Sequence, residues 1–259
     1  EIRAPYLSLL ECQRWINDNI LSALSPHACA TGYVTGRSIR DHASPHVDAG
    51  FVLTIDLENF FPTISFSRVI SIFRGLGYSG QVSTSLAKLC CLDNVLPQGA
   101  PTSPSLSNIV CKRLDEKLER FAIESGLRYT RYVDDMCFSG GEIKKHTLDE
   151  IEKIVSSEGF RTNKSKTHLH APRSNLKLVT GVNVALGKMS LPKSYKRAIS
   201  TDLFHIEKYG LRSHLAKRKI RDPNYIEALV GKVGYWLFIE PENKRAQHYK
   251  QVLAQFVNI

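Results

Sequence analysis

Three carboxylates stand at positions where a folded sheet would bring them together. Asp56 ends a run of β-branched and aromatic residues, and Asp134 and Asp135 lie between two short strand-like runs. Transfer of a phosphoryl group to a hydroxyl needs mainly charge neutralisation, which two Mg²⁺ ions about 4 Å apart supply. Mg²⁺ prefers hard oxygen ligands such as carboxylates, and Mn²⁺ can substitute for it. The sequence therefore predicts a two-metal site on these three acids.

Each acid also has an ordinary structural interpretation. An Asp pair is common in turns, and Asp56 alone can be a strand-end cap. Asp56 and Asp134 are 78 residues apart, so only tertiary structure would join them. Neighbouring side chains of a strand point to opposite faces, but a turn relaxes this rule, so Asp134 and Asp135 need not be equivalent. We expect Asp134 to bind metal most directly.

The elements that must position these acids follow from the pattern of apolar residues. Residues 51–55 are predicted to form a buried strand, and residues 129–133 and 136–138 a hairpin with the carboxylates at its tip. A helix is predicted from an N-cap at Thr102 or Ser103 to Gly126. Other predicted helices are 11–24, 66–76, 81–91, 147–158, 194–209, 223–239 and 243–257, and other predicted strands are 166–170 and 176–184. Gly187 and Pro192 mark a predicted boundary between subdomains.

Composition and charge narrow the class of protein. The 259 residues have the apolar and charged fractions of a soluble globular protein, and no apolar run is long enough to span a bilayer. We expect no signal peptide in the sequence from Glu1 onward, with a processed N-terminus as the alternative. Six cysteines without zinc-ligand spacing predict reduced core thiols in a cytoplasmic protein. The net charge is +10, with −3 on residues 1–160 and +13 on residues 161–259. Such a basic segment suits a polyanion, although a well-solvated surface is the other interpretation.

Four segments resemble, in order, the sequence boxes of reverse transcriptases. Residues 132–135, Tyr-Val-Asp-Asp, are similar to the Y-x-D-D box, and residues 56–61, Asp-Leu-Glu-Asn-Phe-Phe, look like the first catalytic box, D-x-x-x-F-F. Residues 96–104 with Asn108 are similar to the L-P-Q-G-x-P-T-S-P-x-x-x-N box of bacterial members. The next box is matched by Gly159, Phe160, Asn163, Lys166 and Thr167. The resemblance implies an RNA-directed DNA polymerase.

This resemblance implies a role for each matching acid and its neighbours. Asp56 and Asp134 would hold the metals with support from Asp135. Leu57, the residue after Asp56, is expected to contribute both to metal binding and to binding of the incoming nucleotide. Lys166 would sit near the triphosphate and protonate the pyrophosphate that leaves. A solvated lysine is its other interpretation.

Four further positions complete the expected site. Phe61 would be a bulky gate under the sugar that selects dNTPs over NTPs, or else a core aromatic. Gln98 and Gly99 would contact the incoming nucleotide. Arg131 would contact a phosphate or merely pair with a nearby carboxylate.

Within the family, retron reverse transcriptases of bacteria match best. Residues 179–181, Val-Thr-Gly, match their V-T-G signature, and the segment from Arg37 to His46 resembles their R-S-x-x-x-N-A-x-x-H segment. His42 departs from this pattern, in which Asn stands. His46 matches, as a structural histidine or as an RNA contact. The family's R-x-I-x-x-P segment would place an Arg just before Glu1, so we expect the chain to lack its first few dozen residues.

The resemblance also implies an architecture. We expect an α+β right hand with fingers at 1–50, a palm with an antiparallel sheet and packed helices at 51–190, and a basic helical thumb at 191–259. The thumb would grip RNA through four cations, namely Lys217, Arg218, Lys219 and Arg221. Trp236 and Leu237 would be core residues of this helical bundle.

The activity implied is synthesis of a short single-stranded DNA, branched onto a structured noncoding RNA that serves as template and primer. The expected partners are this RNA, its DNA product, dNTPs and an effector protein in antiphage defence, with no membrane. One alternative is a bacterial defence reverse transcriptase that uses no retron RNA. A group II intron maturase is disfavoured because no long extension follows, and a non-catalytic RNA-binding scaffold is disfavoured by the intact acids.

Overall fold

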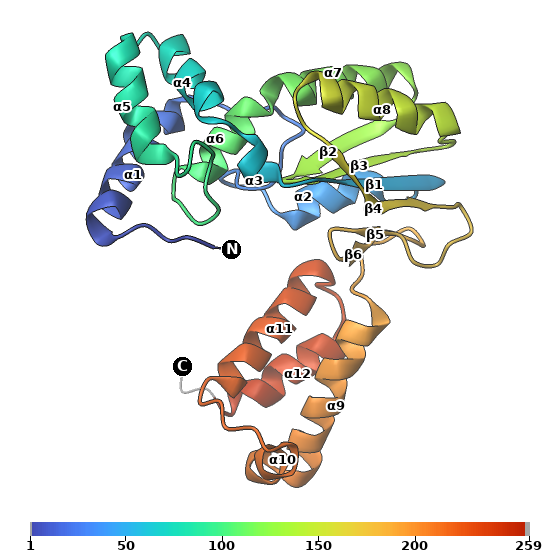
Figure 1. The fold of residues 1–259 in the computed structure, drawn as a ribbon. Coiled ribbons are helices and arrows are strands. Elements are labelled where there is room, and N and C mark those ends of the chain that lie inside the picture. The colour runs from blue at the N-terminus through green and yellow to red at the C-terminus, as the bar shows by residue number, and fades with distance from the viewer. Residues whose placement is uncertain (1, 257–259) are drawn as a thin grey trace. The chain divides into compact units, whose positions relative to one another are not determined.

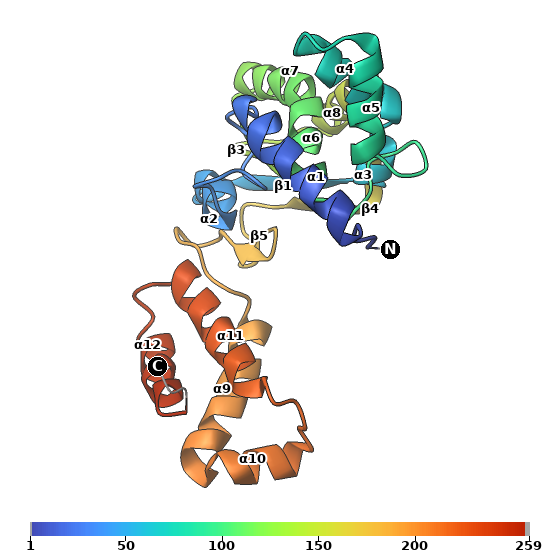
Figure 2. The ribbon, with the colours of Figure 1, turned by 90° about the vertical axis from the view of Figure 1, so that its left-hand side faces the viewer.

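The structure, a computed structural model, describes residues 2–256. The chain divides into two compact units, Glu1–Ser174 and Asn175–Ile259. The first unit combines helices with a four-stranded sheet, and the second consists mainly of helices (Figures 1 and 2). The expected mixture of helices and antiparallel sheet is confirmed, while the names fingers, palm and thumb and their boundaries stay predictions.

The sheet of the first unit is entirely antiparallel. Its strands are β1 (Phe51–Leu57), β2 (Arg128–Tyr132), β3 (Asp135–Gly140) and β4 (Thr162–His170), in the order β2-β3-β1-β4. The predicted strand at 51–55 and the predicted hairpin are confirmed. β4 begins four residues before its predicted start at residue 166, because its polar residues carry little of the apolar signal on which the prediction depended.

Two helices cover one face of this sheet, α7 (Lys112–Glu124) and α8 (Lys145–Ser157), as Figure 1 shows. Alternate strand residues point to them, so Leu53 and Ile55 of β1 and Met136 and Phe138 of β3 are buried in one core with Leu114 and Leu118. The remaining helices of the unit are α1 (Leu7–Asn19), α2 (Ile39–Ala43), α3 (Phe60–Thr63), α4 (Phe66–Gly75), α5 (Gly80–Cys90) and α6 (Ser103–Val110), with short 3₁₀ turns at Leu21–Ala23 and Ser44–His46.

The opposite face of the sheet meets the segment from α2 to His46. Both ring nitrogens of His46 form hydrogen bonds to side chains of the sheet. Nδ1 lies 2.7 Å from the Ser139 hydroxyl of β3, and Nε2 lies 2.7 Å from the Thr130 hydroxyl of β2. The Thr130 hydroxyl also lies 2.7 Å from Nδ1 of His42. His42 therefore keeps a buried polar contact at the position where the family pattern has Asn.

One predicted helix is divided in two. The segment predicted as a single helix from residue 102 to 126 forms α6 and α7, which are separated at the buried Cys111. The apolar stripe continues across the break, which is why the pattern gave no sign of it. The predicted helix start is confirmed, because Thr102 is the N-cap residue of α6 and Pro104 lies in its first turn. No side chain of the described residues makes the capping hydrogen bond, however, and the Ser103 hydroxyl donates to the Pro97 carbonyl at 2.6 Å.

The second unit begins with a small hairpin and continues as helices. β5 (Leu178–Val179) and β6 (Val182–Asn183) are joined by Thr180 and Gly181, whose φ angles of 43° and 83° suit a tight two-residue turn. The predicted single strand at 176–184 is therefore a hairpin. The helices are α9 (Lys193–Tyr209), α10 (Leu211–Arg218), α11 (Tyr225–Ile239) and α12 (Lys244–Ala254).

Three of these helices were predicted, and α10 was missed. α10 buries only His214, so it lacks an apolar stripe, and Gly210 with φ of 81° separates it from α9. The predicted end of the last helix at residue 257 lies outside the described residues. Trp236 is buried as expected for a core residue of the bundle, whereas its neighbour Leu237 is only half-buried.

All six cysteines are free, and four of them are buried, as expected for small core residues. Within residues 2–256, no helix is both long and apolar enough to span a membrane.

Candidate active site

The three predicted acids meet at one end of the sheet. Asp56 of β1 and Asp135 of β3 are direct partners in the antiparallel register, and Asp134 lies in the two-residue turn between β2 and β3. Each offers a carboxylate oxygen within 4.8 Å of the other two. The register places Asp56 and Asp135 on the face of the sheet away from α7 and α8, because their neighbours Ile55 and Met136 point into the core.

The site residues fit a divalent cation on physical grounds. Like charges directly opposite each other on neighbouring strands are destabilising unless something compensates them. Burial, joined by the negative charge of Asp56, raises the pKa of Asp134 above its ordinary value. Three hard oxygen donors converge here from two strands and a turn, which is the donor set that Mg²⁺ and Mn²⁺ prefer.

The turn that carries Asp134 is strained and strongly held. Val133 has φ of 61°, a region that β-branched residues rarely occupy. Its carbonyl accepts a hydrogen bond from Nη1 of Arg131 at 2.9 Å, and the Leu57 amide donates to the Asp134 carbonyl at 3.0 Å. These two contacts fix the turn against β1 and β2.

Arg131 is a structural residue rather than a phosphate contact. Its side chain is fully buried and forms a two-pronged pair with Asp115 of α7, with Nε–Oδ1 at 2.8 Å and Nη2–Oδ2 at 2.6 Å. Asn108 also accepts from its Nη1 at 3.1 Å, and Asn108 donates to the Gly32 carbonyl at 2.9 Å. Of the two roles expected for Arg131, the structure gives the pair with a carboxylate, so its assignment as a substrate-binding residue is withdrawn.

Lys166 reaches the acids from β4. Its Nζ lies 3.1 Å from Oδ2 of Asp56, and the bond and charge of Asp56 raise its pKa. The side chain is 62 % exposed, so it remains available to a ligand. An irregularity in the sheet explains the position, because β4 takes five residue steps from Asn163 to His168 where β1 takes two from Asp56 to Thr54.

The other predicted nucleotide contacts lie in the same unit. Leu57 has a side chain that is 1 % exposed in the core, so only its backbone can take part in the site. Phe60 is buried against Phe160 with ring centroids 5.8 Å apart, while Phe61 is half-buried beside it. The two aromatics thus differ in exposure because they lie on a short helix, α3, and Phe61 keeps a partly free face.

Gln98 and Gly99 form an exposed loop that is joined to the start of the chain. The Arg3 amide donates to the Gln98 carbonyl at 2.9 Å. Gly99 has φ of 116°, and a Cβ there would lie 3.0 Å from the Arg3 carbonyl oxygen, so only glycine suits the position. Arg3 also pairs with Asp93 at 3.0 Å.

The predicted RNA contacts divide into two groups. His46 is fully buried with both nitrogens bonded, and burial together with His42 and Arg128 lowers its pKa to about 3. It is a structural histidine, so its assignment as an RNA contact is withdrawn. The four cations at the end of α10 are all exposed, although Arg218 pairs with Asp202.

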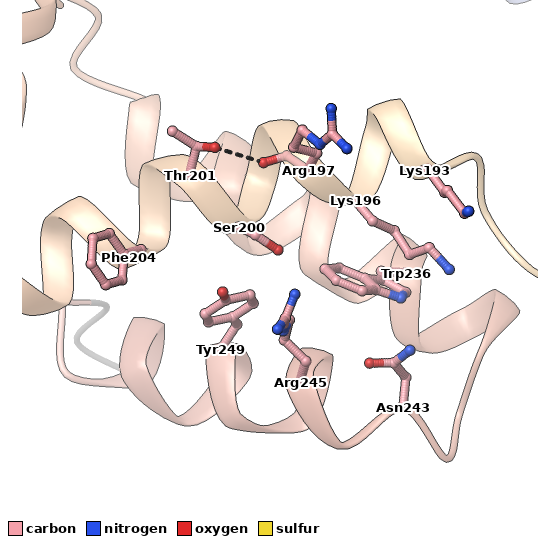
Figure 3. A pocket seen from close by; sticks show the side chains of 10 residues that line it. All are labelled: Lys193, Lys196, Arg197, Ser200, Thr201, Phe204, Trp236, Asn243, Arg245 and Tyr249. Atoms are coloured by element: carbon pink, nitrogen blue, oxygen red, sulfur yellow. Dashed lines mark hydrogen bonds between the residues drawn. The ribbon is translucent and has the colours of Figure 1, made fainter.

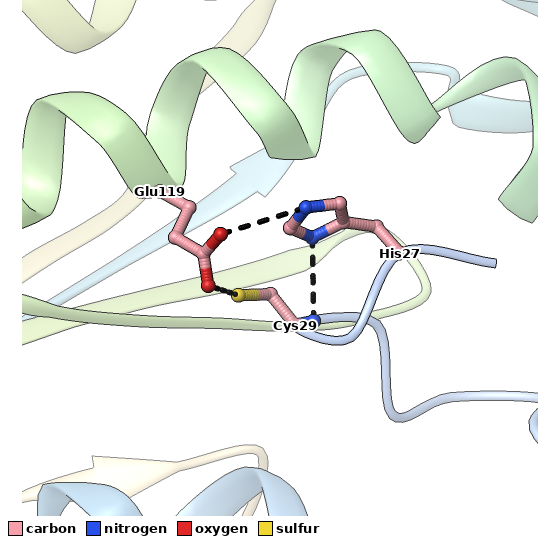
Figure 4. Close-up of side chains that lie close together, drawn as sticks. All are labelled: His27, Cys29 and Glu119. Atoms are coloured by element: carbon pink, nitrogen blue, oxygen red, sulfur yellow. Dashed lines mark hydrogen bonds and ion pairs between the residues drawn. The ribbon is translucent and has the colours of Figure 1, made fainter.

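A second cluster of metal-binding residue types was not predicted. Cys29 donates its thiol hydrogen to Oε1 of Glu119 at 3.0 Å, and Nε2 of His27 lies 3.5 Å from Oε2 (Figure 4). The Cys29 amide donates to Nδ1 of His27, which leaves the ring proton on Nε2 facing the carboxylate. Burial and Glu119 raise the pKa of the Cys29 thiol. The cluster therefore ties the loop to α7 as a hydrogen-bonded group, and spacing gave no sign of it because the cysteine and Glu119 are 90 residues apart.

Comparison with known proteins decides the family. Residues 6–220 match the family described as reverse transcriptase (RNA-dependent DNA polymerase). The chain belongs to this family. Its motif resemblance to retron enzymes is also confirmed, because similar proteins include the retron Ec86 reverse transcriptase of Escherichia coli, 39 % identical over 79 % of this chain and 64 % of that protein.

Two relatives from Myxococcus xanthus agree with this assignment. The retron Mx162 reverse transcriptase is 29 % identical over 95 % of this chain and 56 % of its own length. The retron Mx65 reverse transcriptase is 37 % identical over 71 % of this chain and 47 % of its own length. The chain thus matches about half to two thirds of the length of these relatives. A chain from the telomerase of Candida albicans aligns with a TM-score of 0.46 and 11 % identity over 96 % of this chain and 55 % of that one, a likeness too weak to carry an argument.

Proposed function

We propose that this member of the family is the catalytic part of a retron-type enzyme that copies a structured noncoding RNA into DNA. The observation that carries the proposal is the convergence of Asp56, Asp134 and Asp135 within 4.8 Å at the open end of the sheet. A divalent pair bound there would neutralise the charge of the triphosphate and activate the attacking hydroxyl. The residues around it would bind and orient the nucleotide.

The surrounding side chains have complementary parts in this proposal. Lys166 holds a charge beside the acids and donates its proton to the leaving pyrophosphate. Phe61 presents its half-buried ring as the gate that selects deoxyribose, and Gln98 with Gly99 supplies an exposed backbone edge for the incoming dNTP. Leu57 contributes through its backbone alone.

The specific substrate follows from the retron resemblance. Synthesis would start from a 2′-hydroxyl within the RNA and leave a short DNA branched onto it. The exposed cations Lys217, Lys219 and Arg221 make no ion pair among the described residues, so they are free to hold RNA phosphates with the neighbouring Arg218. The effector protein and the role in antiphage defence rest on the same resemblance.

The test is to purify the full-length protein from its native locus and digest the bound nucleic acid separately with RNase and DNase. We expect a short DNA that survives RNase, becomes slightly shorter, and is absent from an Asp134→Asn, Asp135→Asn variant. RNA alone, together with activity on an added primed template, would instead indicate a defence reverse transcriptase without a retron RNA. Bound RNA without activity on any template would indicate a non-catalytic scaffold.

A further inference from the structure

A groove within the second unit combines unpaired cations with buried hydrogen-bond donors. It has a volume of about 640 Å³, a size typical of ligand sites. α9 contributes Lys193, Lys196, Arg197, Ser200, Thr201 and Phe204, α11 contributes Trp236, and α12 with its N-cap contributes Asn243, Arg245 and Tyr249 (Figure 3). None of these residues belongs to the cation group at the end of α10.

Two polar atoms in this groove lack a hydrogen-bond partner among residues 2–256. Trp236 is 2 % exposed, yet its Nε1–H finds no acceptor in this part of the chain, and the buried hydroxyl of Ser200 also finds no partner there. Figure 3 shows the indole nitrogen on the side of the groove where Lys196 and Asn243 lie. A buried donor without an acceptor has lost the hydrogen bond that it makes with water in the unfolded chain, so these atoms call for an acceptor from outside the chain.

The charge of the groove indicates which acceptor fits. The Glu240 carboxylate pairs with Lys196 of the groove, from which it accepts a hydrogen bond at 2.9 Å, and it also accepts from the Leu191 amide at 2.8 Å and from Asn243 at 2.8 Å. Burial alone would raise the pKa of Glu240, but these three bonds outweigh burial and lower it. The carboxylate is thus fully engaged, and the groove keeps its positive charge.

Three cations remain without a carboxylate among the described residues, namely Lys193, Arg197 and Arg245. Arg245 extends from α12 toward α9 (Figure 3). An indole N–H, a guanidinium and ammonium groups are donors that cannot accept, so the set suits an anion with several oxygens. Phe204, 51 % exposed at the same groove, offers a ring on which a base can stack.

We propose that this groove binds the phosphate backbone of a nucleic acid strand beside an unpaired base. The unit carries 15 Lys and Arg against 6 Asp and Glu, a net charge of +9, which favours a polyanion over a single small anion. The proposal rests on RNA being the partner of this chain, as proposed above, and it adds a second contact surface to the cations of α10.

The first test follows the indole hydrogen of Trp236 by NMR in the full chain. The chain has two tryptophans, and the signal lost in Trp236→Phe identifies the buried one. A mixed-sequence single-stranded RNA should move this signal downfield and leave that of the exposed Trp15 in place. RNA binding without movement of the Trp236 signal overturns the proposal, as does a shift with inorganic phosphate that RNA does not produce.

The second test measures RNA affinity of matched variants by fluorescence anisotropy over a salt series. Arg245→Gln should weaken binding about tenfold and reduce the salt slope by about 0.7, the value for one phosphate contact on a single strand. Lys244→Gln removes the same charge from an exposed neighbour that does not line the groove, and should stay within about twofold of the parent. Equal effects of the two substitutions contradict the proposal.

These readouts are separate from DNA synthesis. The double-aspartate variant should lose synthesis and keep the Trp236 shift. If the parent protein makes no DNA but RNA still moves the Trp236 signal, the proposed activity fails while the groove assignment stands.

Discussion

Lys166 lies beside the acids because of the extra residues in β4. Its proposed role as a proton donor can be distinguished by experiment from a general effect of positive charge. Its Nζ lies 3.1 Å from Asp56 and its side chain remains 62 % exposed. A residue that donates a proton to the leaving group contributes about 10²–10⁴-fold to rate. We therefore expect Lys166→Gln to lower kcat for dNTP incorporation by about 10²-fold, measured by single-nucleotide primer extension.

The control for this prediction is Lys164→Gln. Lys164 is an exposed lysine of the same strand that makes no ion pair among the described residues, so its loss should leave kcat within about twofold. If both variants lose activity equally, the strand supplies only general positive charge, and the role of Lys166 as proton donor is wrong.

Arg131 and His46 illustrate what residue types alone could not decide. Both lie in segments that match the family, and a surface role was an open interpretation for each. Arg131 is instead paired with Asp115 of α7, and His46 is bonded to two hydroxyls of the sheet. Whether Arg131 and His46 are buried depends on which segments pack against the two faces of the sheet. That packing joins distant parts of the chain, so the residue types alone do not reveal it.

At the scale of elements, the turn between β2 and β3 depends on a close approach by Gly32. A Cβ on Gly32 would lie 2.7 Å from both the amide nitrogen and Cγ2 of Val133. Gly32→Ala should therefore destabilise the fold by about 1–3 kcal/mol and lower incorporation as the turn with Asp134 shifts. Urea unfolding and primer extension below the unfolding transition measure the two effects.

Gly75 is the matched control for this substitution. It lies at the end of α4 with no atom within 4 Å of a built Cβ, so Gly75→Ala should be neutral or stabilising by up to about 1 kcal/mol. If Gly32→Ala is as stable and as active as Gly75→Ala, the turn can accommodate a Cβ at position 32, and the predicted clash with Val133 is wrong.

The histidine pair that joins α2 to the sheet predicts a loss of stability in acid. Burial, with a contribution from Arg131, lowers the pKa of His42 to about 3, and burial also lowers that of His46 to about 3. Because the unfolded chain takes up protons near pH 6.5, each histidine contributes stability that is complete above about that pH and is lost as pH falls toward 3. The loss is roughly 1.4 kcal/mol per pH unit for each histidine.

The substitution that tests this is His42→Asn, which restores the family's residue and removes one titrating group. The pH dependence of the free energy of unfolding between about pH 6.5 and pH 5 should become shallower by roughly 1.4 kcal/mol per pH unit. The matched control for the substitution itself is His146→Asn, at an exposed histidine of α8, which should leave the free energy of unfolding at pH 7 within about 0.5 kcal/mol of the parent. An unchanged slope in His42→Asn would contradict the neutral, buried state of that ring.

The helices and strands were predictable to the extent that their apolar patterns were local. β1, the hairpin of β2 and β3, and the helices α4, α5 and α8 carry clear periodicity and lie where the sequence indicated. The break at Cys111 and the helix α10 were not visible, because the first interrupts no apolar stripe and the second has none. The register that pairs Asp56 with Asp135 is likewise a long-range feature, and only the motif order pointed to it.

For the whole molecule, the excess positive charge and the three acids lie in different units of the chain. The acids lie in the unit Glu1–Ser174, and a net charge of +9 lies on the unit Asn175–Ile259. Residues 1–174 carry 20 Lys and Arg against 19 Asp and Glu, a net charge of +1. This division suits a polymerase in which one unit performs the chemistry and the other contributes most of the electrostatic affinity for nucleic acid.

The central claim is that Asp56, Asp134 and Asp135 hold the metals of a DNA polymerase. The most direct measurement is dNTP incorporation on a primed RNA template with Mg²⁺, comparing the parent with Asp134→Asn, Asp135→Asn. The account predicts that incorporation falls by at least about 10³-fold while RNA affinity stays within about twofold, since the acids bind metal rather than RNA. Undiminished incorporation by the double variant would contradict the metal assignment and, with it, the proposed function.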